Sequence, residues 1–134
     1  MPRQAVVVHG VPPALGPYSR AVWAGDFLYL AGLTGIDPDE GRLVPGGIAA
    51  EAEQALRNVA AVLASAALSM GDVVKVGNFL IEMSDFAEAN SIYAQHFEAP
   101  VPARTTVAVA ALPQGARIEI NVIAMRPRLE ARTL

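Results

Sequence analysis

The 134-residue chain contains no cysteine and few charged or aromatic residues. Without cysteine it can have no disulfide framework, no thiolate nucleophile and no cysteine-based metal site. Charged residues make up 17% of the chain, below the roughly 25% of an ordinary domain, and they sum to a net charge of −3. This acidic balance disfavours nucleic acid as the main partner, because phosphate binding relies on an excess of lysine and arginine.

Long apolar segments are also missing. The longest one covers residues 59–70 and is interrupted by Ser65 and Ser69, so it is shorter than the roughly 20 residues that cross a bilayer. The apolar stretch near the N-terminus is too short for a signal peptide. We therefore expect a cytoplasmic protein without a membrane partner.

Hydrophobic residues are abundant, at 53% of the chain. Because little charge is available to cover the surface, we expect an apolar face to be buried against another copy of the chain. The alternative is an alanine- and valine-rich core that hides these side chains within one subunit. The length suits one domain, residues 1–134, with a frayed tail over residues 127–134.

The order of hydrophobic patterns predicts an α+β protein with a mixed, six-stranded sheet. Strands are expected over residues 6–8, 21–23, 27–31, 73–81, 105–112 and 117–125. The last two should form a hairpin. One helix should run from Gly47 or Ile48 to about Leu68, and a second should begin at Ser84 or Asp85. Because crossover connections are right-handed, both helices should cover one sheet face, which leaves the other face to meet other subunits.

Residue spacing gives expectations within these elements. In the first helix, apolar residues at helical spacing predict the buried face: Leu56, Val59, Leu63 and Ala66. Polar residues predict its solvent face: Glu51, Gln54, Asn58 and Ser65. Asp85 and Glu88 have capping-box spacing. In the strand over residues 73–81, alternation places Val74, Val76 and Asn78 on one face.

Arg104 is the most informative candidate for a binding residue. It follows the rigid Pro102-Ala103 pair at the start of an expected strand and is flanked by small residues. A guanidinium that loses water among such neighbours needs a planar acidic partner. That partner is either the carboxylate of a ligand or Glu119, reached across the hairpin or across an interface, and periodicity alone slightly favours Glu119.

Three more polar residues could line a site. Glu119 lies between two isoleucines and could take a proton from water if its surroundings raise its pKa, although a solvated strand residue is the commoner case. Tyr18 ends a Pro/Gly-rich loop and could orient a ligand or anchor that loop. Asn90 could bind a ligand or face water. His9 and His96 have no spacing typical of a metal site.

Several short segments together resemble the RidA/YjgF family of reactive-intermediate deaminases, over about residues 11–126. These segments are Gly16-Pro17-Tyr18-Ser19, Ala31-Gly32, Asp85-Phe86 with Asn90, Pro102-Ala103-Arg104 and Ile118-Glu119-Ile120. The paired segments around Arg104 and Glu119 are the family signature. The resemblance implies a chorismate-mutase-like fold and a homotrimer with sites in the clefts between subunits.

The resemblance also implies a reaction. Family substrates are 2-imino acids and their enamine tautomers: water adds to the imine carbon, ammonia leaves and a 2-keto acid remains. The residue matching Arg104 holds the substrate carboxylate, and the one matching Glu119 handles the attacking water. The implied cleft residues are Tyr18, Gly32 and Asn90, with Ala31 and Thr106 at positions that vary. No metal or cofactor is required, because orientation by an arginine and one positioned water could lower a modest barrier.

Some positions depart from the family pattern and reshape the rim of the cleft. Ala31 stands where many deaminating members carry serine, and Thr106 where some carry cysteine. Leu33 and Gly35 replace a common Gln and Pro, and Asn121 replaces a frequent second acidic residue. These changes bear on the exact substrate.

Three other functions remain open at this stage. A non-catalytic module could sense a small carboxylate in the same cleft, which Ala31 and Leu33 mildly favour. Ribonuclease or translation-inhibitor activity, reported for some relatives, is disfavoured by the net negative charge and by the absence of paired histidines. The hydrophobic composition permits a holdase role but does not indicate one.

Overall fold

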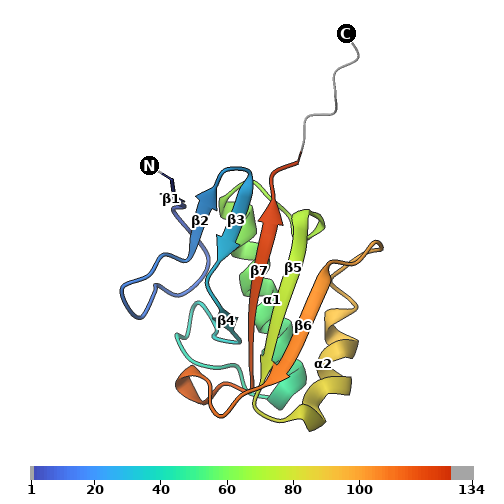
Figure 1. Ribbon diagram of the computed structural model, residues 1–134. Helices are drawn as coiled ribbons and strands as arrows, with labels where there is room; N and C mark the ends of the chain where they lie inside the picture. The colour runs from blue at the N-terminus through green and yellow to red at the C-terminus, as the bar shows by residue number, and fades with distance from the viewer. Residues whose placement is uncertain (1, 128–134) are drawn as a thin grey trace.

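The computed structural model describes residues 2–127, which form one sheet with two α-helices on one face (Figure 1). The strands are β1 (Gln4–Ala5), β2 (Ala21–Ala24), β3 (Phe27–Leu30), β4 (Leu33–Thr34), β5 (Val73–Leu80), β6 (Ala103–Ala108) and β7 (Ile118–Met125). The helices are α1 (Gly47–Ser65) and α2 (Phe86–Tyr93), and 3₁₀ turns cover Met70–Asp72, Met83–Asp85 and Pro113–Gly115. Apart from Pro127, the expected tail lies outside the described residues.

The expected mixed sheet is confirmed, and both helices cover the same face of it, as expected (Figure 1). The strand order is β1-β2-β3-β7-β5-β6, and the two-residue β4, which was not expected, pairs with β7 as a seventh strand. β5 and β6 are parallel and are connected through α2. Every second residue of β7 is buried beneath the helices: Ile118, Ile120, Val122 and Ala124. No helix in the described part of the chain is long and apolar enough to cross a membrane.

The hairpin expected from the last two strands is wrong. β5 lies between β6 and β7, parallel to the first and antiparallel to the second. Residues 109–117 separate β6 from β7 along the chain, which is long enough to carry the backbone past the end of β5. The mostly apolar β5 and β7 therefore lie inside the sheet, and β6, which carries Arg104, takes its edge.

The expected strand over residues 6–8 is also wrong. The paired residues are Gln4–Ala5, which lie opposite Trp23 and Val22. Beyond them the Val6 amide still donates a hydrogen bond to the Ala21 carbonyl at 3.0 Å. The valine run packs partly against the core instead of extending the edge of the sheet.

The faces expected for β5 are wrong at its start. The pairing of β5 with β7 shifts register between Val73 and Lys75. As a result Val73 is buried and Val74 is exposed, whereas Val76 and Asn78 are buried. An extra residue in one strand reverses the faces of the residues before it, and alternation in the sequence cannot show where it occurs.

The solvent face expected for α1 is wrong for Glu51 and Asn58, which are both buried. Asn58 Nδ2 donates hydrogen bonds to the carbonyls of Thr34 and Ile36 at 3.0 and 2.9 Å. Glu51 Oε1 accepts a hydrogen bond from the Arg117 amide at 2.8 Å. Both side chains are buried because they form hydrogen bonds with backbone groups of segments that pack against the helix. Helical spacing in the sequence cannot show that these backbone groups lie there.

The capping box expected from Asp85 and Glu88 is wrong. The Asp85 side chain makes no cap hydrogen bond at the start of α2. Its buried carboxylate instead accepts hydrogen bonds from Nη2 of Arg117 at 2.9 Å and from Nε at 3.2 Å. A guanidinium fork is a stronger partner for a buried carboxylate than a backbone amide. Arg117 thus connects the start of β7 to α2 through its side chain and to α1 through its backbone.

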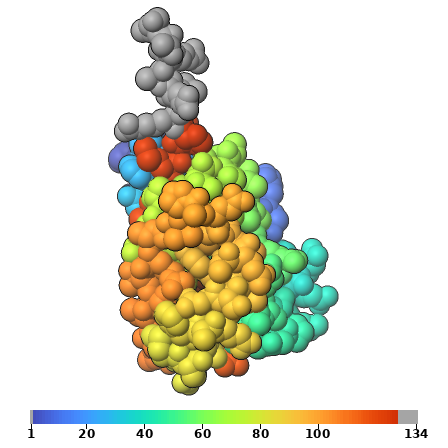
Figure 2. Space-filling view, turned by 90° about the vertical axis from the view of Figure 1, so that its right-hand side faces the viewer, coloured from blue at the N-terminus to red at the C-terminus, as the bar shows by residue number. Residues whose placement is uncertain are grey.

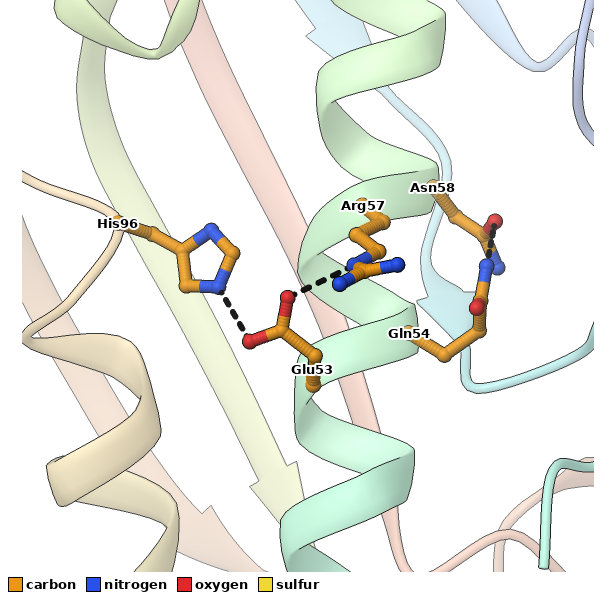
Figure 3. Close-up of polar contacts among 5 residues, drawn as sticks. All are labelled: Glu53, Gln54, Arg57, Asn58 and His96. Atoms are coloured by element: carbon orange, nitrogen blue, oxygen red, sulfur yellow. Dashed lines mark hydrogen bonds and ion pairs between the residues drawn. The ribbon is translucent and has the colours of Figure 1, made fainter.

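A second polar cluster joins α1 to the segment that follows α2. Glu53 Oε1 lies 2.9 Å from Nε2 of His96, and its Oε2 accepts a hydrogen bond from Nε of Arg57 at 2.8 Å (Figure 3). The hydrogen bonds from His96 and then from Arg57 lower the pKa of the Glu53 carboxyl below its usual value. This cluster fixes the end of α2 to the middle of α1.

We expect the Asp85→Ala variant to lose about 1.5–3 kcal/mol of unfolding free energy, because the charged hydrogen bonds of Arg117 lose their acceptor. Urea denaturation at pH 7 measures this loss. The matched control is Glu40→Ala, which removes the carboxylate of an exposed pair with Arg42 at 3.2 Å and should cost less than about 1 kcal/mol. Equal losses in the two variants would contradict a structural role for the Asp85–Arg117 pair.

Candidate active site

Glu119 lies on the open face of the sheet, opposite the helices, because its neighbours in β7 point into the core. The backbone at Gly32 runs directly against it. A Cβ atom added to Gly32 would lie 2.6 Å from Cδ of Glu119, closer than two carbon atoms can approach. A larger residue at position 32 would force the Glu119 carboxylate to move, so Gly32 forms one wall around the carboxylate in its present position.

The chain reaches Gly32 through a shift in strand pairing. In β3, Tyr29 lies opposite Ile123 of β7, whereas Leu33 of β4 lies opposite Ile120. Between these two pairs the chain takes four residue steps from β3 to β4 but only three along β7. The extra residue lifts residues 31–32 out of the regular ladder, as strand bulges near binding sites commonly do.

Glu119 and Gly32 line a pocket of about 290 Å³. Its other walls include Tyr18, Thr34 and Asn58, together with the proline-rich loop before β2. Ala31 precedes Gly32, and its amide donates a hydrogen bond to the Arg20 carbonyl at 2.9 Å. The structure thus brings together three of the expected site residues around this pocket, Tyr18, Gly32 and Glu119, with Ala31 next to Gly32 in the chain.

Arg20 shapes this pocket, although it was not among the residues expected at a site. Its Nη2 donates hydrogen bonds to the carbonyls of Pro12 and Pro13 at 2.8 and 3.1 Å. Its guanidinium also lies 5.7 Å from the ring centre of Tyr18. Prolines have carbonyl acceptors but no backbone N–H donor, so a loop rich in proline needs donors from elsewhere. An arginine soon after such a loop is therefore a sequence signal that could have identified Arg20.

Burial raises the pKa of the Glu119 carboxyl above its usual value. Removal of water disfavours the charged form, and no ion pair within residues 2–127 offsets that cost. A half-buried carboxyl of this kind can exchange protons with a ligand or a water molecule more readily than one in bulk solvent.

Arg104 lies away from the Glu119 pocket, on the edge strand β6, and its side chain is on the sheet face that the helices cover. It is aligned with Val76 of β5, whose side chain is buried beneath the helices. Together with Asn90 it lines a groove of about 510 Å³ beside α2. Its guanidinium lies over the Tyr93 ring at 4.7 Å, and among the described residues it forms no ion pair with a carboxylate.

The expected site residues therefore form two separate groups. Thr106 points to the same side of β6 as Arg104, and its buried Oγ1 forms no hydrogen bond within the described part of the chain. Arg104 lies on β6 and Glu119 on β7, and β5 runs between these two strands. The two strands are therefore two strand spacings, about 10 Å, apart, and the two side chains lie on opposite faces of the sheet. The internal Arg104–Glu119 ion pair favoured by periodicity is absent from residues 2–127. One bound molecule cannot contact both side chains of the same chain.

The part of the chain that the structure describes contains no cluster of three or more His, Asp or Glu side chains able to hold a metal ion. His96 bonds to Glu53 and lines a different groove, next to Met70 and Pro100. The groups present in the two candidate pockets are carboxylate, hydroxyl, amide and guanidinium. They suit a small polar ligand with a carboxylate.

The sheet, its two helices, the pocket beside Glu119 and the groove beside Arg104 define a class of small α+β proteins with a candidate site for a small carboxylate. The chain belongs to the RidA/YjgF family, since the family model described as endoribonuclease L-PSP matches residues 9–126. It is 43% identical over 124 residues to the 2-iminobutanoate/2-iminopropanoate deaminase of Mus musculus, covering 92% of each chain.

Solved structures share the fold as well as the sequence. RidA from the Antarctic bacterium Psychrobacter superposes with a TM-score of 0.87 at 39% identity, over 91% of this chain and 98% of that one. TdcF of E. coli, solved with bound serine, superposes with a TM-score of 0.86 at 34% identity, over 92% and 99% of the two chains.

The raised pKa of Glu119 predicts a pH-dependent effect of the Glu119→Gln substitution on stability. The folded chain binds the proton more tightly than the unfolded chain does, so the carboxyl favours folding below its unfolded pKa, near 4.5. That contribution is lost as the pH rises through the higher folded pKa. We therefore expect Glu119→Gln to unfold at a higher urea concentration than wild type at pH 7, with a smaller difference at pH 4. A difference that grows toward acid pH would contradict the raised pKa.

Proposed function

We propose that this protein is a hydrolytic deaminase that converts 2-imino acids and their enamine tautomers into 2-keto acids and ammonia. The observation that carries the proposal is a pair of pockets on opposite faces of the sheet, which we call half-sites. One holds Arg104, which has no acidic partner within residues 2–127, and the other holds the half-buried carboxyl of Glu119. The first group suits a substrate carboxylate and the second suits a reacting water. Relatives named as 2-iminobutanoate/2-iminopropanoate deaminases, at 41–43% identity, support this choice of substrate.

In the proposed mechanism Arg104 binds the substrate carboxylate through two parallel hydrogen bonds. Glu119 orients a water molecule and accepts its proton while the water oxygen adds to the imine carbon. Glu119 returns this proton to the nitrogen as the carbon–nitrogen double bond becomes single, which gives a carbinolamine. The proton of its hydroxyl then passes to the nitrogen as the remaining carbon–nitrogen bond breaks, so that ammonia leaves and the carbon keeps the oxygen as a ketone. The raised pKa of Glu119 lets the same carboxyl hold and return the proton.

The remaining cleft residues have positional roles in this proposal. The hydroxyl of Tyr18 orients the substrate, and Gly32 leaves space beside Glu119. Asn90 lines the Arg104 groove. Ala31 and Thr106 set the shape of the rim.

We further propose a homotrimer in which Arg104 of one subunit and Glu119 of its neighbour share a site. Exposed apolar side chains on the open sheet face support burial against other copies: Phe27, Tyr29, Val74 and Val107. The placement of Arg104 and Glu119 on opposite faces supports a site built from two chains. The bound serine of TdcF, a small molecule with a carboxylate, is consistent with a cleft of this size. A cytoplasmic location is part of the same proposal.

The Arg104→Ala variant tests the carboxylate anchor. Loss of a bidentate charged contact should reduce kcat/KM for 2-iminobutanoate by at least about 30-fold. Arg104→Lys should retain part of the activity, because lysine keeps the charge but lacks the guanidinium fork. The imine is generated in place by a threonine dehydratase, and formation of 2-ketobutyrate is timed.

Two outcomes would replace the deaminase proposal. Binding of 2-ketobutyrate by calorimetry without any acceleration of imine hydrolysis would support a non-catalytic carboxylate-binding protein. RNA cleavage that survives Arg104→Ala and repeated purification would support a ribonuclease. Equal deamination rates of wild type and Arg104→Ala would refute the role of Arg104.

Mixing two inactive variants tests the shared site. Arg104→Ala and Glu119→Ala subunits each lack one half, but a mixed trimer contains sites with an intact arginine from one chain and an intact glutamate from the next. Random assembly at equal amounts should restore about a quarter of wild-type activity. Co-expression of the two variants, with each variant alone as the control, measures this recovery. No recovery in verified mixed trimers would contradict a site between subunits.

A further inference from the structure

The Arg104 guanidinium lies over aromatic rings of α2. Its central carbon is 4.7 Å from the ring centre of Tyr93 and 5.6 Å from that of Phe86. An aromatic face attracts a cation, and the attraction is stronger when both groups have lost water. Figure 2 views this side of the molecule, where α2 and β6 lie side by side.

Burial and packing against a second ring hold the Tyr93 ring in place. Tyr93 is 8% exposed, and its ring packs against that of Phe97 with centres 4.6 Å apart. The next residue back from Phe97 is His96, which is held to α1 through Glu53. The tyrosine ring therefore cannot move away from Arg104 without disturbing its packing against Phe97.

The ring face of Tyr93, rather than its hydroxyl, contacts Arg104, whose central carbon lies 4.7 Å from the ring centre. The hydroxyl is buried and forms no hydrogen bond within residues 2–127. The electrostatic link between the two side chains is also visible in the pKa of Tyr93, which burial raises and the charge of Arg104 lowers.

We propose that Tyr93 is the positioning residue of the carboxylate anchor: its ring face holds the Arg104 guanidinium in one orientation and leaves its edge donors free for the substrate. This inference rests on the proposed function. A flexible arginine would lose side-chain entropy on binding each carboxylate, and a stacked one has already lost it. Tyr93 thus acts on affinity rather than on the chemical step.

The test compares Tyr93→Leu, which removes the ring face, with Tyr93→Phe, which keeps it. We expect Tyr93→Leu to raise the Kd of 2-ketobutyrate and the KM of the imine by about 5- to 30-fold, about 1–2 kcal/mol, with kcat changed less than about twofold. Tyr93→Phe should restore wild-type values. The matched control is Trp23→Leu, which removes the ring under Arg126, a stack at 4.1 Å outside both half-sites, and should leave binding unchanged.

A second readout does not depend on any activity. The aromatic ring shifts the NMR signal of the Arg104 Nε–H proton upfield, and this shift should vanish in Tyr93→Leu and persist in Tyr93→Phe. The inference is overturned if Tyr93→Leu binds the keto acid like wild type, or if Tyr93→Phe is as weak as Tyr93→Leu. If the wild-type protein neither binds 2-ketobutyrate nor accelerates hydrolysis while the upfield shift is present, the proposed function has failed and the positioning role fails with it.

Discussion

The position of β5 between β6 and β7 is the constraint on which the candidate site depends. It separates Arg104 from Glu119 by two strand spacings, and the alternation of side chains along each strand directs them to opposite faces. A direct hairpin between β6 and β7 would have allowed the two charges to neutralise each other. Within residues 2–127, the actual order leaves Arg104 without an acidic partner and leaves Glu119 half-buried without a cation.

The same sheet order explains where polar groups are buried. Arg117 stands at the start of β7, the strand whose alternate residues are covered by the helices, and it ties α1 and α2 to that strand through Glu51 and Asp85. Asn58 supports the loop that follows β4 in a similar way. These contacts hold the wall around Glu119 in place, while the aromatic face of α2 holds Arg104. The pocket beside Glu119 and the groove beside Arg104 thus rest on different contacts.

Sequence reasoning identified the elements well and their internal faces less well. The two helices, β2, β3 and β7 follow from apolar spacing and from turn residues, which are local properties. The burial of Glu51 and Asn58 depends on carbonyl and amide groups from distant loops, so helical spacing suggested the opposite. The bulge that exposes Val74 and the charge pair that removes Asp85 from its capping role also arise from partners far along the chain.

The sequence by itself determined the α+β class, the family resemblance and the identity of the candidate residues, because these are carried by composition, periodicity and short motifs. Only the tertiary structure decided which of those residues meet. It placed Tyr18, Gly32 and Glu119 around one pocket and Arg104 with Asn90 in another groove. The physical reason is that strand order is set by long-range packing of apolar faces, and neighbours along the chain carry no record of it.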